Sequence, residues 1–293
     1  MFAKEEEKKK TKKASKKKVS HISETELDED FNWAFTPLLD SLSRNVSTFQ
    51  AGAIPRVILQ VSNTSSSFAL PAKYQEARSS WVVLNPGYSV KLFSLKDMDR
   101  FVYYKCSEEE RNAYNRLSVV KQRVALFKFL YLLKRGGIYA ELDTECRVPV
   151  KSWSLGKRNV GLVIGFKDQH HNPPSFQQAV IAATPNHPVI AEFVKKQVSD
   201  ILTRTQSDFS AHVSFHDYFY KRFNEYMTQV MKQAGINPQI ELAKLSWSGY
   251  AEFDDVLVHG NERFTPNNQN NILAFVVNRG GFWDEEFLNV SVA

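Results

Sequence analysis

The sequence predicts an α/β protein in which helices flank a mostly parallel central sheet. Segments of strand character alternate with segments of helical character along most of the chain. A pair of glycines at 136 and 137 separates the most apolar helical segment from a strand. The 293 residues, 43% hydrophobic and 13% aromatic, are enough to bury one large core. We therefore expect a single main domain over residues 31–293.

The first strands of the expected sheet come from two apolar segments. Residues 54–62 (IPRVILQVS) read as a buried strand, with Pro55 at its first position, where the missing N–H costs little. A helix over about 71–80 and a turn at 85–88 then lead to a strand within 88–94, where apolar residues alternate with polar ones.

Residues 96–133 have a helical pattern. The last helix of this segment carries a buried stripe at helical spacing, formed by Val120, Val124, Phe127 and Tyr131. Gly136 and Gly137 end it, because only glycine enters the left-handed cap conformation without strain. Further along, we expect strands within 137–145, 159–166, 254–260 and 271–277, and helices within 176–183, 188–203 and 209–234.

The net positive charge lies in an N-terminal tail. Residues 1–18 contain nine lysines and three glutamates, a surplus that equals the whole formal charge of +6, and an acidic run follows. We expect residues 1–30 to be disordered and solvated, with peripheral contact to an anionic membrane as the alternative. No nucleic-acid partner is expected, because the rest of the chain is balanced in charge. A short amphipathic helix is expected at 31–42.

Cysteine content and apolar runs narrow the class of protein further. Cys106 and Cys146 alone imply neither a disulfide framework nor a CxxC metal site. The most apolar run, 124–133, contains Lys128 and is too short to span a bilayer. Lysines occupy the place where a signal peptide would have its apolar segment.

Three carboxylates, those of Glu141, Asp143 and Glu145, follow the glycine pair at a spacing of two. In a continuous strand they would project from one face. Ligands gather at the carboxyl ends of parallel strands, and Mg²⁺ or Mn²⁺ prefers carboxylate oxygens. The pattern suits metal-assisted nucleotide binding, although acids at a strand end, taken alone, more often form a cap or a surface ion pair.

Several segments, in order, resemble glycosyltransferase family 32, the group of initiating α-1,6-mannosyltransferases, inositol-phosphoceramide mannosyltransferases and α-1,4-galactosyltransferases. They are IPRVILQVS, SSWVVLNPGYSVKLFSLKDMDRFV, RVALFKFLYLLKRGGIYAELDTECRVP, GLVIGF with QQAVIAATPNHPVI, and RFTP with AFVVNRGGFW. The likeness spans residues 54–283. Its most specific parts are the GGIYxxxD block and the P-x-HP sequence after QQ.

The resemblance implies a GT-A-type nucleotide-sugar-binding sandwich, a divalent cation (Mn²⁺ or Mg²⁺) and sugar transfer with retention at the anomeric carbon. The Asp-x-Asp signature of the family falls on Glu141 and Asp143, which with Asn278 are the implied metal ligands. Asp143, Glu141 and Lys128 are the implied catalytic residues. The implied donor-binding residues are Gln60, Gln122, Lys128, Tyr139, Glu141, Asp143 and Trp283.

Four positions depart from the pattern of the family. A helical aspartate and arginine three residues apart are replaced by Ala125 and Lys128, and a C-terminal histidine and serine by Asn278 and Phe282. Lysine can meet a phosphate as a point charge but lacks the bidentate fork of arginine. Gln122, one turn earlier on the same face as Ala125, is a candidate to take over sugar recognition.

The resemblance thus implies a metal-dependent retaining glycosyltransferase. It would transfer a hexose, mannose first, from GDP-mannose or a UDP-hexose to a glycan or lipid-linked acceptor. A catalytically degenerate protein that keeps the fold for binding is the alternative. Family members are usually Golgi proteins with an N-terminal membrane helix. The chain is therefore expected to be a soluble form of such an enzyme or a cytoplasmic protein of a virus or bacterium.

Overall fold

The computed structural model describes residues 53–153, 160–168, 174–204, 215–238, 250–253, 255–259 and 274–276. These residues belong to a unit that spans residues 46–293. The tail at 1–30, the helix expected at 31–42, and Asn278, Phe282 and Trp283 lie outside the described residues. None of the helices in the described ranges is long and apolar enough to cross a bilayer.

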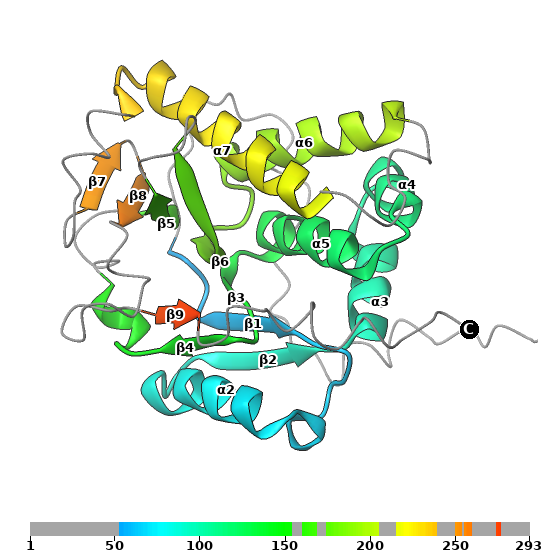
Figure 1. Ribbon diagram of the computed structural model, residues 1–293, viewed down its shortest axis with the longest axis vertical. Helices are drawn as coiled ribbons and strands as arrows, with labels where there is room; N and C mark the ends of the chain where they lie inside the picture. Colours follow the sequence, from blue (N-terminus) through cyan, green and yellow to red (C-terminus); the bar gives the residue numbers. More distant parts are fainter. Residues whose placement is uncertain are drawn as a thin grey trace, which may run out of the picture. The chain divides into compact units, whose positions relative to one another are not determined.

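A mixed sheet lies at the centre of the described residues (Figure 1). Its order is β2 (Ser89–Phe93), β1 (Val57–Val61), β3 (Gly137–Ala140), β6 (Ser175–Ala183), β5 (Leu162–Asp168), β8 (Val256–His259) and β7 (Tyr250–Phe253). β1 is parallel to β2 and β3, and β5 is parallel to β8. β6 runs against β3 and β5, and β7 runs against β8. Apart from β6 and β7, the described strands of this sheet therefore point the same way, which confirms the mostly parallel sheet.

Helices lie on both sides of this sheet (Figure 1). On one side lies α2 (Ala72–Leu84), which follows the short helical turn η2 (Ser67–Ala69). A small second sheet consists of β4 (Thr144–Cys146) and β9 (Ala274–Val276). Helix α2 packs against β4 of this second sheet. The turn η3 (Val150–Ser152) follows β4. The other side carries α5 (Val120–Arg135), α6 (Pro188–Thr203) and α7 (Phe215–Gln233), with α3 (Leu95–Lys105) and α4 (Glu108–Arg116) against α5. The predicted α/β sandwich is confirmed.

Each side of the sheet has its own apolar core. On the α2 side, the Trp81 ring packs edge-on against Trp153, with 5.9 Å between centroids, beside the buried strand residues Ile58 and Ile138. On the α5 side, the core is a cluster of aromatic rings from β2 and helices α3, α5, α6 and α7, namely Phe93, Phe101, Phe127, Phe129, Tyr131, Phe193 and Phe223. The stripe predicted on α5 faces this cluster.

Two predictions about strands are wrong. Residues 176–183 belong to strand β6 and not to a helix, because β3 and β5 pair with them on both sides and the ladder outweighs the helix propensity of an alanine-rich run. The strand expected within 137–145 is interrupted after Ala140 by a turn, and β4 begins only at Thr144. The sequence analysis also missed β7.

Both the backbone conformation and the closeness of neighbouring atoms require glycine at the two positions between α5 and β3. Gly136 and Gly137 have φ of +63° and +98°. A Cβ on Gly136 would lie 2.6 Å from Cδ of Pro185 and 2.8 Å from the carbonyl oxygen of Ala183. A Cβ on Gly137 would lie 2.8 Å from the carbonyl oxygen of Val57.

We expect Gly136→Ala to lower the free energy of unfolding by about 2–4 kcal/mol, because strain and overlap act together. Urea unfolding measures the change. Gly87→Ala is the matched control, since Gly87 also has a positive φ, +117°, but its Cβ would meet nothing within 4 Å. Equal losses in the two variants would contradict a steric role for Gly136.

Candidate functional site

The site predicted from the acidic residues is a tight turn at the carboxyl end of β3. The backbone N–H of Glu141 donates to the carbonyl oxygen of Ala179 at 2.8 Å, and that of Thr144 donates to the carbonyl oxygen of Glu141 at 3.0 Å. Glu141 and Asp143 thus stand on one turn, which we call the acid turn (residues 141–143). Asp143 is only 6% exposed.

The expectation that three carboxylates share one strand face is wrong. Because the chain turns between β3 and β4, the side chain of Glu145 lies beyond the acid turn, where it pairs with Nη1 of Arg147 at 3.1 Å. Within the described ranges, His, Cys, Asp and Glu side chains do not form any group of three that could hold a metal ion. A cation at the acid turn would therefore rely on two carboxylates and on ligand oxygens.

The carboxylate of Glu141 is held from two sides. The hydroxyl of Tyr139 donates to its Oε2 at 2.9 Å, and Nζ of Lys128 lies 3.6 Å from its Oε1. Burial is the main cause that raises the pKa of Tyr139 well above its usual value, with the charge of Glu141 adding to it. The Tyr139 hydroxyl therefore stays a hydrogen-bond donor at neutral pH.

The ammonium of Lys128 lies inside a cage of aromatic rings. Lys128 is 2% exposed, and its Nζ donates to the carbonyl oxygen of Gln178 at 3.2 Å. Nζ also lies 5.5 Å from the ring centroids of both Tyr139 and Tyr220, and 5.7 Å from that of Phe129. Burial lowers the pKa of Lys128, and the charge of Glu141 opposes that shift. Among the described residues, the ammonium of Lys128 is thus held by other groups of the protein.

Helix α2 fixes the other end of the acid turn. The indole N–H of Trp81 donates to the carbonyl oxygen of Thr144 at 2.8 Å, and the backbone N–H of Cys146 donates to the hydroxyl of Ser80 at 2.8 Å. The acid turn is therefore anchored by α5 and β6 before it and by α2 after it. This double attachment positions Asp143.

The other described residues that the sequence predicted, on β1 and α5, are also buried. Gln60, at the end of β1, is fully buried, and its Oε1 accepts from Nη1 of Arg78 on α2 at 2.7 Å. Gln122 is 6% exposed in the first turn of α5, and its Oε1 has no hydrogen-bond partner among the described residues. Ala125 is buried one turn before Lys128. The structure thus brings together Lys128, Tyr139 and Glu141.

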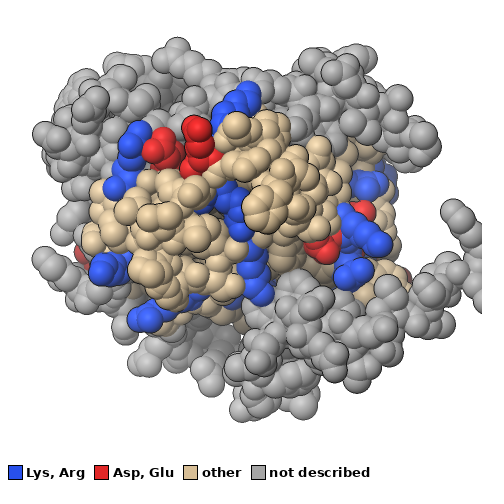
Figure 2. All heavy atoms as spheres, turned by 90° about the horizontal axis from the view of Figure 1, so that it is seen from below, with Lys and Arg blue, Asp and Glu red and all other residues tan. Residues whose placement is uncertain are grey.

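Charged side chains on the α2 side of the molecule are mixed. In Figure 2, lysine and arginine side chains spread over the described part of this face, and acidic side chains stand beside some of them. On the described part of this face, positive charge is therefore less concentrated than in residues 1–18, where nine lysines stand against three glutamates.

Comparison with known proteins finds a match over the segment that contains this site. A family model described as a glycosyltransferase sugar-binding region containing a DXD motif matches residues 71–159. Residues 71–159 thus resemble a DXD-type glycosyltransferase region, and because of this likeness we refer to them below as the glycosyltransferase region. The match extends from α2 through β4 and includes Lys128, Tyr139 and the acid turn. Tyr220 and Gln178, which complete the Lys128 cage, lie outside this glycosyltransferase region and were missed by the sequence analysis.

Two curated relatives show the same likeness. The putative glycosyltransferase HOC1 of Saccharomyces cerevisiae is 23% identical, over 64% of this chain and 45% of that protein. An initiation-specific alpha-1,6-mannosyltransferase of Candida albicans is 27% identical, over 46% of this chain and 40% of its own. Among solved structures, PaToxG glycosyltransferase is 16% identical, with 66% of this chain and 74% of that chain covered and a TM-score of 0.42. The expected resemblance to family 32 is confirmed, and the chain spans less than half of the length of these curated relatives.

Proposed function

We propose that this chain is a retaining glycosyltransferase that moves a hexose from a nucleotide sugar to a glycan or lipid-linked acceptor. Mannose from GDP-mannose is the first donor to test, ahead of galactose or glucose from UDP-sugars. The observation that carries the proposal is the position of Glu141 and Asp143. Both stand on a turn at the carboxyl end of β3, inside the glycosyltransferase region.

The donor set of the acid turn fits a divalent cation. Two carboxylates are hard oxygen ligands, and Mg²⁺ or Mn²⁺ is commonly held by one or two carboxylates together with substrate phosphates. Asp143, at the position of the second acid of the Asp-x-Asp signature, would be the principal ligand, and Glu141, whose two oxygens contact Tyr139 and Lys128, would support it. The cation, when bound, would neutralise charge on the leaving diphosphate.

The residues around the acid turn would then act by orientation. Lys128 neutralises and positions Glu141, and the Tyr139 hydroxyl fixes the direction of its second oxygen. These contacts are made by groups of the protein itself, so the carboxylates would need little reorganisation when charge develops on the diphosphate. Such preorganised electrostatics is the main contribution that the described residues offer to the reaction.

Calorimetric titration with GDP and UDP, each with and without Mn²⁺, tests this function. We expect one nucleotide to bind at least tenfold more tightly in the presence of Mn²⁺, because its phosphates complete the coordination of the cation. Binding that is absent for both nucleotides, or equal with and without the cation, would refute the proposed donor site.

A degenerate protein that keeps the fold for binding is the second candidate, and the burial of Lys128 favours it. An ammonium that is 2% exposed and already paired with Glu141 is poorly placed to meet a substrate phosphate. Ala125, on the preceding turn, offers no hydrogen-bonding side chain. If this candidate holds, hydrolysis of the donor should be absent in the native chain and should appear in the double variant Ala125→Asp, Lys128→Arg. Robust hydrolysis by the native chain would exclude it.

A further inference from the structure

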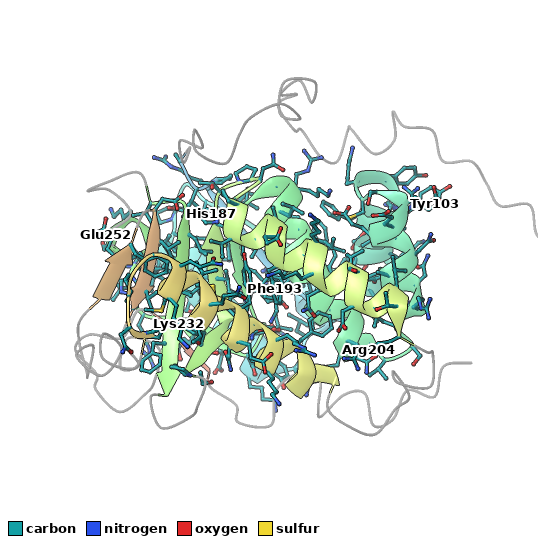
Figure 3. The ribbon with its side chains drawn as sticks, turned by 90° about the horizontal axis from the view of Figure 1, so that it is seen from above. Tyr103, His187, Phe193, Arg204, Lys232 and Glu252 are labelled. Carbon is teal, nitrogen blue, oxygen red and sulfur yellow. The ribbon has the colours of Figure 1, made fainter. Side chains whose placement is uncertain are left out.

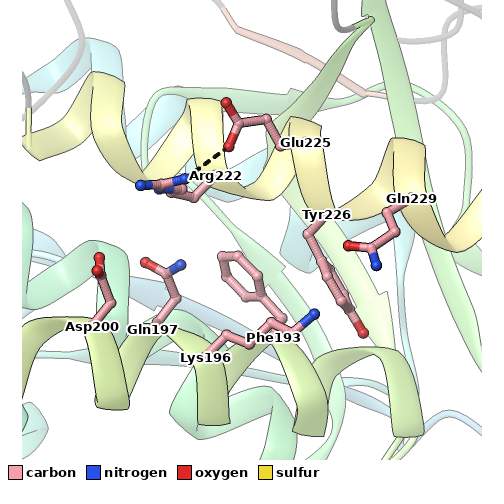
Figure 4. Close-up of a pocket in the computed structure, with 8 residues that line it drawn as sticks. All are labelled: Phe193, Lys196, Gln197, Asp200, Arg222, Glu225, Tyr226 and Gln229. Carbon is pink, nitrogen blue, oxygen red and sulfur yellow. Dashed lines mark hydrogen bonds and ion pairs between the residues drawn. The ribbon is translucent and has the colours of Figure 1, made fainter.

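A groove between α6 and α7 holds polar side chains that the proposed function does not use. The two helices run over the sheet with Phe193 between them (Figure 3), and the hollow has a volume of about 320 Å³. Phe193, Lys196, Gln197 and Asp200 line it from α6, and Arg222 and Tyr226 line it from α7 (Figure 4). Its volume lies at the small end of ligand pockets, about 300–1,000 Å³.

The charges of the groove balance one another. Nη1 of Arg222 donates to Oε2 of Glu225 at 3.1 Å, so this ion pair belongs to the α7 wall. On the α6 wall, the carboxylate of Asp200 pairs with Nε of Arg204 at 3.2 Å. With Lys196 added, the lining carries two cations and two carboxylates. Neither an anion nor a cation would be strongly favoured there.

Two side chains give the groove a specific chemistry. Gln197 is 4% exposed, and its Oε1 has no hydrogen-bond partner among the described residues, which makes it an acceptor awaiting a donor. The ring of Tyr226 is partly exposed. It packs 5.7 Å from that of Phe193, between centroids, and Nζ of Lys196 lies 4.9 Å from its centroid, so one face remains for a ligand beside Lys196. Figure 4 shows the Gln197 amide directed from α6 toward α7. The groove thus combines an aromatic surface with an unsatisfied amide.

We infer that this groove binds a neutral carbohydrate, one or two hexose units long, against the ring of Tyr226 and the amide of Gln197. Sugar hydroxyls both donate and accept hydrogen bonds, so they match a lining that mixes amides, carboxylates and cations. The apolar face of a hexose matches an aromatic ring. An apolar peptide would find only the two rings. The inference rests on the lining of the groove and not on the proposed transfer reaction.

Ligand-observed NMR titration of the full chain with mannobiose tests the inference. We expect saturable binding in the native chain, and a dissociation constant at least about tenfold higher in Tyr226→Ala, as for a lost aromatic contact. Tyr226→Phe keeps the ring and should bind nearly as the native chain does, which also guards against a folding defect in the alanine variant. Gln197→Leu, of similar size, should weaken binding severalfold.

Neighbouring lysines on α6 provide a matched control. Lys196 lines the groove and Lys195 does not, so Lys196→Ala should weaken mannobiose binding and Lys195→Ala should not. Unchanged binding in Tyr226→Ala and Gln197→Leu would overturn the inference, as would tight binding of a neutral hexapeptide in place of the sugar. Asp143→Asn, which should lose metal-dependent nucleotide binding, is expected to bind mannobiose normally. The two proposals can therefore fail separately.

Discussion

Asp143→Asn is expected to reduce donor hydrolysis, measured as release of GDP from GDP-mannose with Mn²⁺, by about a thousandfold or more. The amide is nearly isosteric but loses the charge that would hold the cation, and such electrostatic stabilisation accounts for several kcal/mol of the barrier. Because Asp143 is buried on an anchored turn, a neighbouring carboxylate cannot replace it without rebuilding the turn.

Glu145→Gln is the matched control for this variant. Glu145 lies two residues further along, on β4, and pairs with Arg147 away from the acid turn. Its loss should leave hydrolysis within about twofold of the native rate. Comparable losses in both variants, or full activity in Asp143→Asn, would contradict the role assigned to Asp143.

Lys128→Met is expected to lower the free energy of unfolding by about 3 kcal/mol. The change leaves Glu141 on the acid turn without its cation, and removal of one partner from a buried pair costs this much. The double variant Lys128→Met, Glu141→Gln should recover most of the loss, because neither charge then remains. Urea unfolding of the four proteins in this double-mutant cycle measures the coupling, and additive losses would show that the pair is not coupled.

The difference in the free energy of unfolding between the native chain and Lys128→Met should depend on pH. Burial lowers the folded-state pKa of Lys128 below the ordinary value of 10.5. Between the lowered value and 10.5, the unfolded chain binds more protons at this position, so the free energy of unfolding rises with pH. Below that pH range Lys128 is charged in both the folded and the unfolded state, so the burial of its charge lowers the free energy of unfolding by its full amount. The native chain should therefore gain stability relative to Lys128→Met as the pH rises through the range between the lowered pKa of Lys128 and 10.5.

The elements that could be predicted from sequence are those whose signals are local. The helix expected at 188–203 matches α6 because its start is encoded nearby: Nδ1 of His187 accepts from the N–H of Val189, and Pro188 begins the helix. The end of α5 was predicted for the same reason, since the glycine pair fixes it. In contrast, β6 was predicted as a helix because its identity depends on pairing with β3 and β5, which no local pattern reveals.

The candidate site, too, could be predicted from the sequence only in part. The acidic residues stood out in sequence because they follow a recognisable glycine break. The directions of their side chains could not be predicted, because the turn at 141–143 interrupts the alternation of side chains that a continuous strand would impose. The cage around Lys128 joins α5, β3, β6 and α7, with Tyr220 ninety-two positions along the chain. The dense aromatics of 209–234 suggested packing, but their partner could be found only in three dimensions.

The attachment of the acid turn to α2 on one side and to α5 on the other makes it a bridge between two independently packed layers. Loosening either layer would shift Asp143 while most of the sheet stays intact. Thermal inactivation should therefore precede global melting, and core substitutions far from the turn, on either side, should change the catalytic rate before they change the amount of folded protein.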